Sequence, residues 1–259
     1  MNDKQGIEKV KNIILVSSGK GGVGKSTVTS NLAGALYSIG YSVGVLDADI
    51  YGPSQNLMFG INNNIAVVPA KNPMYTMPNE SCGIKVASIA SRIEEGKSIN
   101  WRGPMLSIGL INMIYYTDWG ELDYLVIDMP PGTGDIQISI CEKLKDAKVV
   151  IVTTPQDVAL IDCRKGIDMY LNNRINIIGI VENMSGYVCS CCGNVDNIFG
   201  LDGGEKLAKE YQIKLIGKLP IQTNIRLNAD NGLPITLTDP DNSISKIYES
   251  IAKEVVNYE

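Results

Sequence analysis

Residues 13–28 read IILVSSGKGGVGKSTV: an apolar run, a glycine-rich turn, and then lysine, serine and threonine. The apolar run predicts a buried strand, and the apolar residues at helical spacing after the turn predict a helix. The turn fits G-x-x-x-x-G-K-[ST], a pattern in which loop amides and a helix N-terminus face phosphate oxygens. Because a strand and a helix flank the motif in the required order, this stretch predicts a nucleotide phosphate site.

The residue types in this loop suit that chemistry. Glycine lets the backbone wrap an anion where a Cβ would block it. We expect Lys25 to reach the β- and γ-phosphates and the Ser26 hydroxyl to ligate Mg²⁺. The residues expected to hold nucleotide here are Gly19, Lys20, Gly21, Gly22, Val23, Gly24, Lys25, Ser26 and Thr27.

The composition favours one domain over residues 1–259. The chain is 44% hydrophobic, without long polar tracts, which suits a single large core. Its formal charge of −5 argues against general nucleic-acid binding, because phosphate contacts need clustered Lys and Arg. The N-terminus resembles no signal peptide, and no apolar run approaches the ~20 residues of a membrane span. We therefore expect a cytoplasmic protein without nucleic-acid or membrane partners.

The alternation of predicted strands and helices indicates βαβ units. It predicts an α/β fold with a mainly parallel sheet and helices on both faces. The predicted strands cover residues 13–16, 41–46, 84–90, 122–127, 148–153, 175–181 and 213–219, and the later predicted helices cover 104–116, 158–171 and 243–257.

Acidic residues follow two of the predicted strands. Asp47 and Asp49 come after one, and Asp128 after another. The carboxyl ends of parallel strands meet at the edge where open α/β sheets bind ligands. Asp128 fits a Walker B carboxylate near Mg²⁺. Asp47 and Asp49 could hold the hydration shell of the metal or orient water, or they could simply form the turn.

Two further positions follow strands. Gly132, in the loop after Asp128, could present its amide to a γ-phosphate and make the loop sensitive to hydrolysis. Asn183 could read a base edge through its paired donor and acceptor, or it could form a turn.

The chain has six cysteines and no histidine. In residues 187–193, Tyr-Val-Cys-Ser-Cys-Cys-Gly, Cys189 and Cys192 form a C-x-x-C pair that can present two thiolates to one metal or cluster. A redox pair, expected at a helix start, and unrelated buried thiols are the alternatives. A Cys₄ site needs four ligands, and there is no second C-x-x-C. Two chains around a twofold axis would complete it, which predicts a homodimer.

Lys20, directly after Gly19, makes the loop resemble the deviant Walker A motif of SIMIBI-class ATPases such as MinD, ParA and the nitrogenase iron protein. The order of motifs along residues 12 to about 235 resembles the Mrp/ApbC-type iron-sulfur cluster carrier ATPases. The motifs are the Walker loop, DADIYGPS (47–54), WRGPM (101–105), DMPPGTGD (128–135), ENMS (182–185) and C-x-x-C-G (189–193).

This resemblance implies a P-loop NTPase fold of the SIMIBI class that binds Mg²⁺ and binds and hydrolyses ATP. We expect hydrolysis to be slow, because the motifs supply positioning and charge but no evident strong base. It implies a homodimer that holds a 4Fe-4S cluster between its two C-x-x-C pairs and passes it to apo iron-sulfur proteins, with cluster-assembly factors as further partners. We also expect neither the cysteine-rich N-terminal segment of eukaryotic relatives nor the small N-terminal domain of many bacterial ones.

The resemblance also implies roles for single residues. Lys20 would reach the nucleotide of the partner subunit and stabilise charge on the transferred phosphate. Asp49 would activate the attacking water. Pro220, at the start of the loop after the last strand, would lie by the adenine. Cys191 is additional to the family pattern.

Two alternative functions share the predicted ATP site. A spatial-organising ATPase of the MinD or ParA kind would bind DNA or membrane, and the acidic charge and the C-x-x-C pair count against it. An ATPase whose dimer is bridged by structural zinc would show the same cysteine spacing. Only the resemblance favours an iron-sulfur cluster over zinc.

Overall fold

The structure is a computed structural model that describes residues 6–62, 69–72, 74–92, 103–189 and 191–258. In chain order its elements are β1 (Val10–Ser17), α1 (Lys25–Ser38), β2 (Val43–Asp47), α2 (Gln55–Met58), β3 (Asn79–Ser81), β4 (Ile84–Ser88), the 3-10 turn η1 (Ile89–Arg92), α3 (Gly103–Tyr116), β5 (Leu122–Asp128), α4 (Asp135–Lys143), β6 (Lys148–Thr153), α5 (Asp157–Asn172), β7 (Asn176–Val188), β8 (Val195–Asp196), α6 (Gly203–Tyr211), β9 (Leu215–Ile221), α7 (Thr223–Asp230), α8 (Ile235–Thr238) and α9 (Ser243–Val256).

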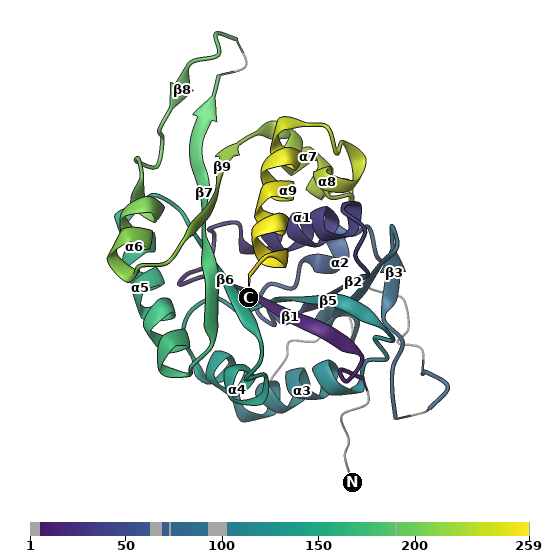
Figure 1. Ribbon diagram of the computed structural model, residues 1–259. Coiled ribbons are helices and arrows are strands. Elements are labelled where there is room, and N and C mark those ends of the chain that lie inside the picture. Colours follow the sequence, from purple (N-terminus) through teal and green to yellow (C-terminus); the bar gives the residue numbers. More distant parts are fainter. Residues whose placement is uncertain (1–5, 63–68, 73, 93–102, 190, 259) are drawn as a thin grey trace.

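The strands form one sheet in the order β3-β4-β2-β5-β1-β6-β7-β8, and β9 pairs with β7 (Figure 1). Pairing is parallel except where β3 meets β4 and β8 meets β7. Val16 near the end of β1 is level with Asp128 in β5, and Asp128 is level with Asp47 in β2. The loop after β1 therefore begins beside both carboxylates.

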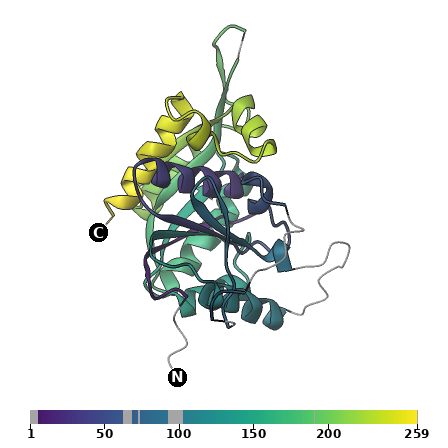
Figure 2. The ribbon, with the colours of Figure 1, turned by 90° about the vertical axis from the view of Figure 1, so that its right-hand side faces the viewer.

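Helices cover both faces of the sheet (Figures 1 and 2). Successive strand residues point to opposite faces. Leu15 packs into the core that α3, α4, α5 and α6 cover, whereas Val16 packs into the core that α1 and α9 cover. This two-sided burial explains why the central strands read as continuous runs of Val, Ile and Leu. The predicted mainly parallel sheet with helices on both faces is confirmed.

The structure corrects the predicted ends of two strands. We expected a strand to end at residue 181, but β7 continues to Val188, because β9 and β8 pair with its second half. We expected Pro220 to begin a loop, but it lies inside β9. Among the described strands β9 pairs only with β7, so it has the free edge that proline needs because it lacks an N–H.

Two further expectations concern other parts of the chain. Trp101 and Arg102 of the WRGPM sequence motif lie outside the described residues. Within the described ranges, no helix combines the length and the apolar character that crossing a membrane requires.

Candidate functional site

The glycines of the phosphate loop are required by both conformation and packing. Gly22 and Gly24 both have φ of 81°, in the left-handed region that favours glycine. A Cβ on Gly24 would lie 2.2 Å from the Asn183 side chain, and one on Gly19 would lie 2.3 Å from the backbone of Asp162 in α5. The loop is therefore held between β7 and α5 by contacts that exclude any side chain.

Lys25, the first residue of α1, lies between two carboxylates. Its Nζ is 2.6 Å from Asp128 Oδ1 and 3.3 Å from Asp49 Oδ2, and only 6% of its side chain is exposed. The Ser26 hydroxyl lies 3.5 Å from the same Nζ. The structure thus brings together four residues that the sequence predicted, from the ends of β2 and β5 and the start of α1.

Asp128 is fully buried and uses both oxygens. Oδ1 accepts from Lys25 and from the Thr29 hydroxyl, and Oδ2 accepts from Gln55 Nε2 at 2.8 Å. Gln55 Nε2 also donates to the Ser26 carbonyl, so it connects α2 to both parts of the site. The sequence analysis missed Gln55 and Thr29. The helical spacing of four residues from Lys25 could have indicated Thr29, which lies one turn further along α1.

Asp47 holds the loop that follows β2. Its Oδ2 accepts from the backbone N–H groups of Ser54 and Gln55, both at 2.9 Å, and from the Ser88 hydroxyl at 3.1 Å. Burial and the nearby charge of Asp128 raise the pKa of Asp47 to about 7, and the Gln55 amide opposes that shift. These contacts are those expected if Asp47 forms the turn. A contact between Asp47 and Mg²⁺ stays a prediction.

A cavity opens over the phosphate loop. Asp49 Oδ1, Ser54 Oγ and Gln55 Oε1 are buried there or beside it, and each lacks a hydrogen-bond partner in the described part of the chain. Such groups are costly unless something satisfies them. Oxygen ligands and water-bonding groups of this kind fit Mg²⁺, which keeps several waters. The cavity is lined by Ser18, Lys20, Gly21, Gly22, Gly24, Lys25, Ser26, Thr27, Asp49, Gly52, Ser54, Met58 and Pro131.

Lys20 and Gly132 lie at the rim of the loop. The Lys20 side chain is half-exposed, and its ammonium makes no ion pair with any residue that the structure describes. The amide of Gly132, which has φ of 91°, donates to the Ser18 carbonyl at 3.0 Å. The Gly132 amide therefore contacts the phosphate loop, and its expected contact with a γ-phosphate stays a prediction.

Asn183 and Pro220 lie on the neighbouring strands β7 and β9. Asn183 Nδ2 donates to the Val23 carbonyl at 2.8 Å, so the side-chain donor expected to read a base is used to hold the phosphate loop. Pro220 is half-buried within β9. The roles of both residues beside an adenine stay predictions.

The cysteine pair lies at the tip of the β7–β8 hairpin, which projects beyond the body of the molecule (Figures 1 and 2). The backbone N–H groups of Cys191 and Cys192 donate to the Cys189 sulfur and lower the pKa of its thiol. Gly193, with φ of 71°, closes the turn by donating to the Cys189 carbonyl. Hydrogen bonds to sulfur favour the thiolate, the form that binds metal.

The part of one chain that the structure describes does not complete a metal site with these cysteines. Within the described ranges, no group of three or more Cys, Asp or Glu side chains is placed to hold a metal ion. Burial raises the pKa of Cys141 to about 11 and that of Cys163 to about 12, and Cys82 lies in the turn between β3 and β4. A site shared by two chains agrees with this geometry and stays a prediction.

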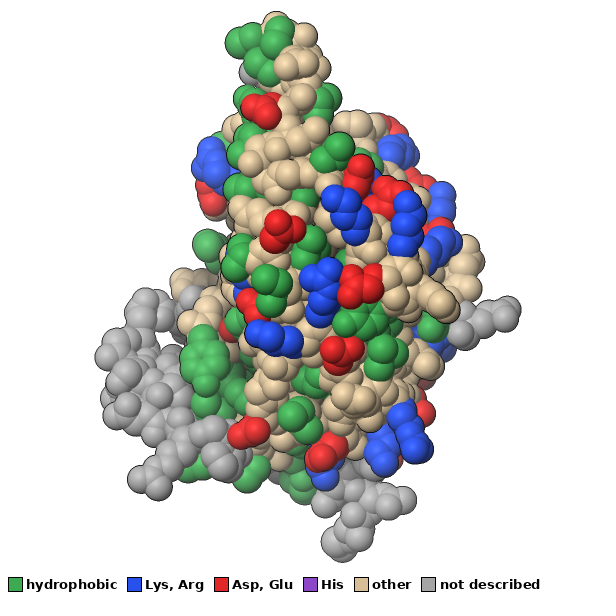
Figure 3. All heavy atoms as spheres, turned by 90° about the vertical axis from the view of Figure 1, so that its left-hand side faces the viewer, with side chains coloured by type: hydrophobic (Ala, Val, Ile, Leu, Met, Phe, Trp, Pro, Cys, Tyr) green, Lys and Arg blue, Asp and Glu red, His purple; other side chains and the backbone are tan. Residues whose placement is uncertain are grey.

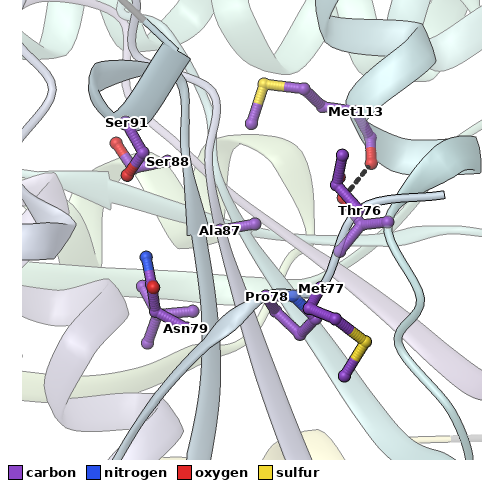
Figure 4. Close-up of a pocket in the computed structure, with 10 residues that line it drawn as sticks. Thr76, Met77, Pro78, Asn79, Ala87, Ser88, Ser91 and Met113 are labelled. Atoms are coloured by element: carbon purple, nitrogen blue, oxygen red, sulfur yellow. Dashed lines mark hydrogen bonds between the residues drawn. The ribbon is translucent and has the colours of Figure 1, made fainter. Parts of the chain in front are cut away.

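A second, smaller pocket lies between β4 and α3 (Figure 4). The described residues that line it are all neutral, so none of them offers a cation to a phosphate. The Ser88 hydroxyl on its wall donates to Asp47 and thereby braces the nucleotide site from behind. The labelled side chains are Thr76, Met77, Pro78, Asn79, Ala87, Ser88, Ser91 and Met113.

Comparisons with known proteins identify the family to which the chain is similar. A family model described as the NUBPL iron-transfer P-loop NTPase of the ParA group matches residues 9–256. The chain is 49% identical to the iron-sulfur cluster carrier protein of Pseudomonas fragi, over 95% of this chain and 86% of that protein. It is 46% identical to the protein of the same name from Escherichia coli K12, over 98% of this chain and 69% of that protein.

Solved structures show the same fold. A nucleotide-binding protein from Archaeoglobus fulgidus in complex with ADP has a TM-score of 0.80 at 33% identity, covering 95% of this chain and 96% of that one. The cell division ATPase MinD of Pyrococcus furiosus has a TM-score of 0.69 at 22% identity, over 95% of this chain and 98% of its own, and shares the fold.

Proposed function

Because the chain belongs to the ParA/NUBPL family of iron-transfer P-loop NTPases, we propose that it carries a 4Fe-4S cluster and hydrolyses ATP. Two copies would hold the cluster between their cysteine pairs and pass it to apo iron-sulfur proteins in the cytoplasm, with cluster-assembly factors as suppliers. The observation that carries this proposal is the presence, in one chain, of a phosphate loop and a projecting C-x-x-C turn whose amides stabilise a thiolate.

The nucleotide site supplies positioning and charge. Lys25 would bind the β- and γ-phosphates, and Ser26 with Asp128 would hold Mg²⁺, which would neutralise charge on the phosphates when bound. Asp49 would orient the attacking water through its unpartnered Oδ1. Lys20 would act across the dimer on the transferred phosphate. We expect Asp49→Asn to slow ATP hydrolysis by at least ~10-fold while ATP still binds, and an unchanged rate in a single-turnover assay would contradict this role.

The hairpin supplies the cargo site. Val188 and Val195 in the hairpin, and Ile198 just beyond β8, expose apolar side chains. Figure 3 shows hydrophobic side chains on the projecting part of the molecule. Exposed apolar side chains gathered beside a metal-binding turn suit contact with another protein surface. A second copy placed there would bring two further thiolates to the cluster, and a client protein would find the cluster at an accessible tip.

The test is anaerobic reconstitution with iron and sulfide. We expect about four irons and four sulfides per dimer in the wild type, and loss of both in the Cys189→Ser/Cys192→Ser double variant. Cys191→Ser is the matched control, because it keeps the Cys191 backbone N–H, the larger of the two contributions of Cys191 to the Cys189 thiol, and its hydroxyl can replace the smaller side-chain hydrogen bond. Its cluster content should equal that of the wild type. Zinc in place of iron, or cluster content indifferent to Cys189 and Cys192, would overturn the proposal.

A further inference from the structure

Two buried polar side chains lie where β7 leaves the body of the sheet, Glu182 and Asn183. Glu182 is fully buried, and Asn183 is 9% exposed. Pairing between β6 and β7 ends at Glu182, so the rest of β7 runs toward Cys189 with β9 and β8 as its neighbours. At these two residues β7 therefore passes from the centre of the sheet into the hairpin that carries the cysteines.

Asn183 is in direct contact with the phosphate loop. Its Nδ2 donates to the Val23 carbonyl at 2.8 Å, and the same nitrogen would lie 2.2 Å from a Cβ on Gly24. The contact combines a hydrogen bond with close packing. If Val23 and Gly24 move, the Asn183 side chain must consequently move with them or lose this contact.

Glu182 ties the next part of β7 to α6. Its Oε2 accepts from the backbone N–H of Gly204 at 2.6 Å, and its Oε1 accepts from the Ser185 hydroxyl at 2.7 Å. One oxygen of this fully buried carboxylate thus fixes β7 to α6, and the other holds the Ser185 side chain two residues beyond Asn183. This leaves the strand little freedom to move except as a unit with those contacts.

β7 bends between these contacts. Met184 has φ of 55°, an unusual value for a residue other than glycine, and the register with β9 shifts between Asn183 and Tyr187. Beyond the bend, Tyr187 pairs with β9 and β8. At the rise of a strand, the six steps from Asn183 to Cys189 span at most about 20 Å.

We propose that Glu182, Asn183 and Ser185 are positioning residues that transmit the nucleotide state of the phosphate loop to the cysteine hairpin. Phosphates bind to the amides of the loop, so the Val23–Gly24 segment shifts when nucleotide arrives or leaves. Asn183 passes the shift to β7 by contact, and the Glu182–Ser185 bond carries it through the bend at Met184. The placement of Cys189 and Cys192 then depends on nucleotide. This inference rests on the proposed function, because it concerns how one site of that carrier controls the other.

The test measures thiol reactivity in cluster-free protein. Alkylation by iodoacetamide is followed at each cysteine by peptide mass spectrometry, with and without saturating Mg-ATP. In the wild type we expect the rates at Cys189 and Cys192 to change roughly threefold or more. Cys82, which is exposed and lies in the β3–β4 turn, is the internal reference and should not respond.

Variants locate the link. Ser185→Ala removes one hydrogen bond of a half-buried hydroxyl, and we expect it to abolish the nucleotide response. Asn183→Ala should also abolish the nucleotide response. This variant is tested at a nucleotide concentration that a direct binding measurement has shown to saturate it. Glu182→Gln keeps an acceptor for Gly204 and a donor for the Ser185 oxygen, so it should retain the response, whereas Glu182→Leu should lose it.

An unchanged alkylation rate in nucleotide-saturated wild type would overturn the inference, as would a Ser185→Ala protein that responds like the wild type. If Asn183→Ala fails to fold, Ser185→Ala and the two Glu182 variants still test whether these residues transmit the nucleotide state. Failure of the proposed function would appear elsewhere, as wild-type protein that binds no cluster on reconstitution, and the alkylation assay requires no cluster.

Discussion

The phosphate loop and the cysteine hairpin differ most in how much of the molecule supports them. Lys25 and Asp128 are buried, and each has at least two polar partners from other elements. The hairpin is joined by two residue pairs between β7 and β8, and Cys191 and Cys192 are exposed. A site that must orient phosphate needs preorganised groups, whereas a site that must hand over its cargo needs access. Among the described residues, the phosphate loop gathers its polar partners within one chain, whereas the cysteine turn brings together no group of three or more metal-binding side chains.

The largest expected difference between the two regions is in hydrogen exchange. Amides of β1, at the centre of the sheet, should exchange only on near-global unfolding, while the amides of Cys191 and Cys192 should exchange by local opening of the hairpin. We expect β1 to be protected at least roughly a thousandfold more, which corresponds to about 4 kcal/mol. Exchange measured by mass spectrometry on the free protein decides this. Comparable protection in the two regions would show that the hairpin is packed in solution.

Breaking the nucleotide site should leave the hairpin intact. Lys25→Met removes the cation that the loop presents to phosphate, and we expect nucleotide affinity to fall at least ~100-fold, about 2.8 kcal/mol. Calorimetric titration with ATP measures this loss, and reconstituted cluster content should be unaffected. Lys11→Met, which alters an exposed lysine near the opposite end of β1, is the control and should bind ATP normally. Retained affinity in Lys25→Met would remove Lys25 from the phosphate site.

Disturbing the cysteine turn should weaken metal binding and leave nucleotide binding intact. Gly193 has φ of 71°, so Gly193→Ala should cost about 1 kcal/mol in the closed turn and weaken cobalt or zinc binding to the cysteine pair roughly fivefold. Global stability should barely change, because the hairpin opens locally. Gly166→Ala is the control: Gly166 lies inside α5 with open space around its Cβ position, and alanine there should stabilise by about 0.5–1 kcal/mol. An unaffected metal affinity in Gly193→Ala would show that the turn is not preformed.

The smallest effect is expected at the opposite end of the sheet from both sites. Asp123 accepts from Lys11, from the Ser42 hydroxyl and from the Ser42 backbone, and these contacts lower its pKa to about 2. A lowered folded-state pKa stabilises the protein above the unfolded value near 4 and ceases to do so as the pH falls toward 2. Since the pair is partly exposed, we expect Asp123→Asn to cost only about 0.5 kcal/mol at pH 7.

Urea unfolding of wild type and Asp123→Asn at pH 7 and at the lowest pH where both fold tests this sign. The difference in free energy of unfolding should shrink as the pH falls below 4. A constant or growing difference would mean that the carboxylate contributes through something other than its charge.

Local motifs predicted which residues the structure brings together around the phosphate loop. The loop after β1 and the residues Lys25, Ser26 and Asp128 could be placed together, because carboxyl ends of neighbouring parallel strands meet at one edge. Gln55 could not be predicted, since its contacts with Ser26 and Asp128 exist only when α2 packs beside the loop. For Asp47 the sequence left open a role near the metal or a role in the turn. Its hydrogen bonds to backbone N–H groups seven and eight residues away show the turn, which local sequence could not establish, and a metal contact stays a prediction.

The hairpin was less predictable than the nucleotide site. The C-x-x-C spacing indicated a metal-binding turn, but the asparagine and methionine after residue 181 read as the end of a strand. In the structure β7 continues through Met184 with a bend, because β9 supplies a partner on one side and β8 on the other. Strand pairing between distant segments is not encoded in local propensity. The same is true of Pro220, which becomes a strand residue only because β9 has a free edge.

The position of Lys25 between Asp128 and Asp49 has a consequence for the order of ligand binding. When phosphate takes up the lysine charge, a fully buried carboxylate loses its counterion, which is costly unless another cation arrives. Mg²⁺ at Asp128 would restore that balance. Nucleotide and magnesium should consequently bind with positive thermodynamic linkage, each raising the affinity for the other by the same factor. The ATP site would then respond to the concentration of the complex of ATP with magnesium more than to that of either alone.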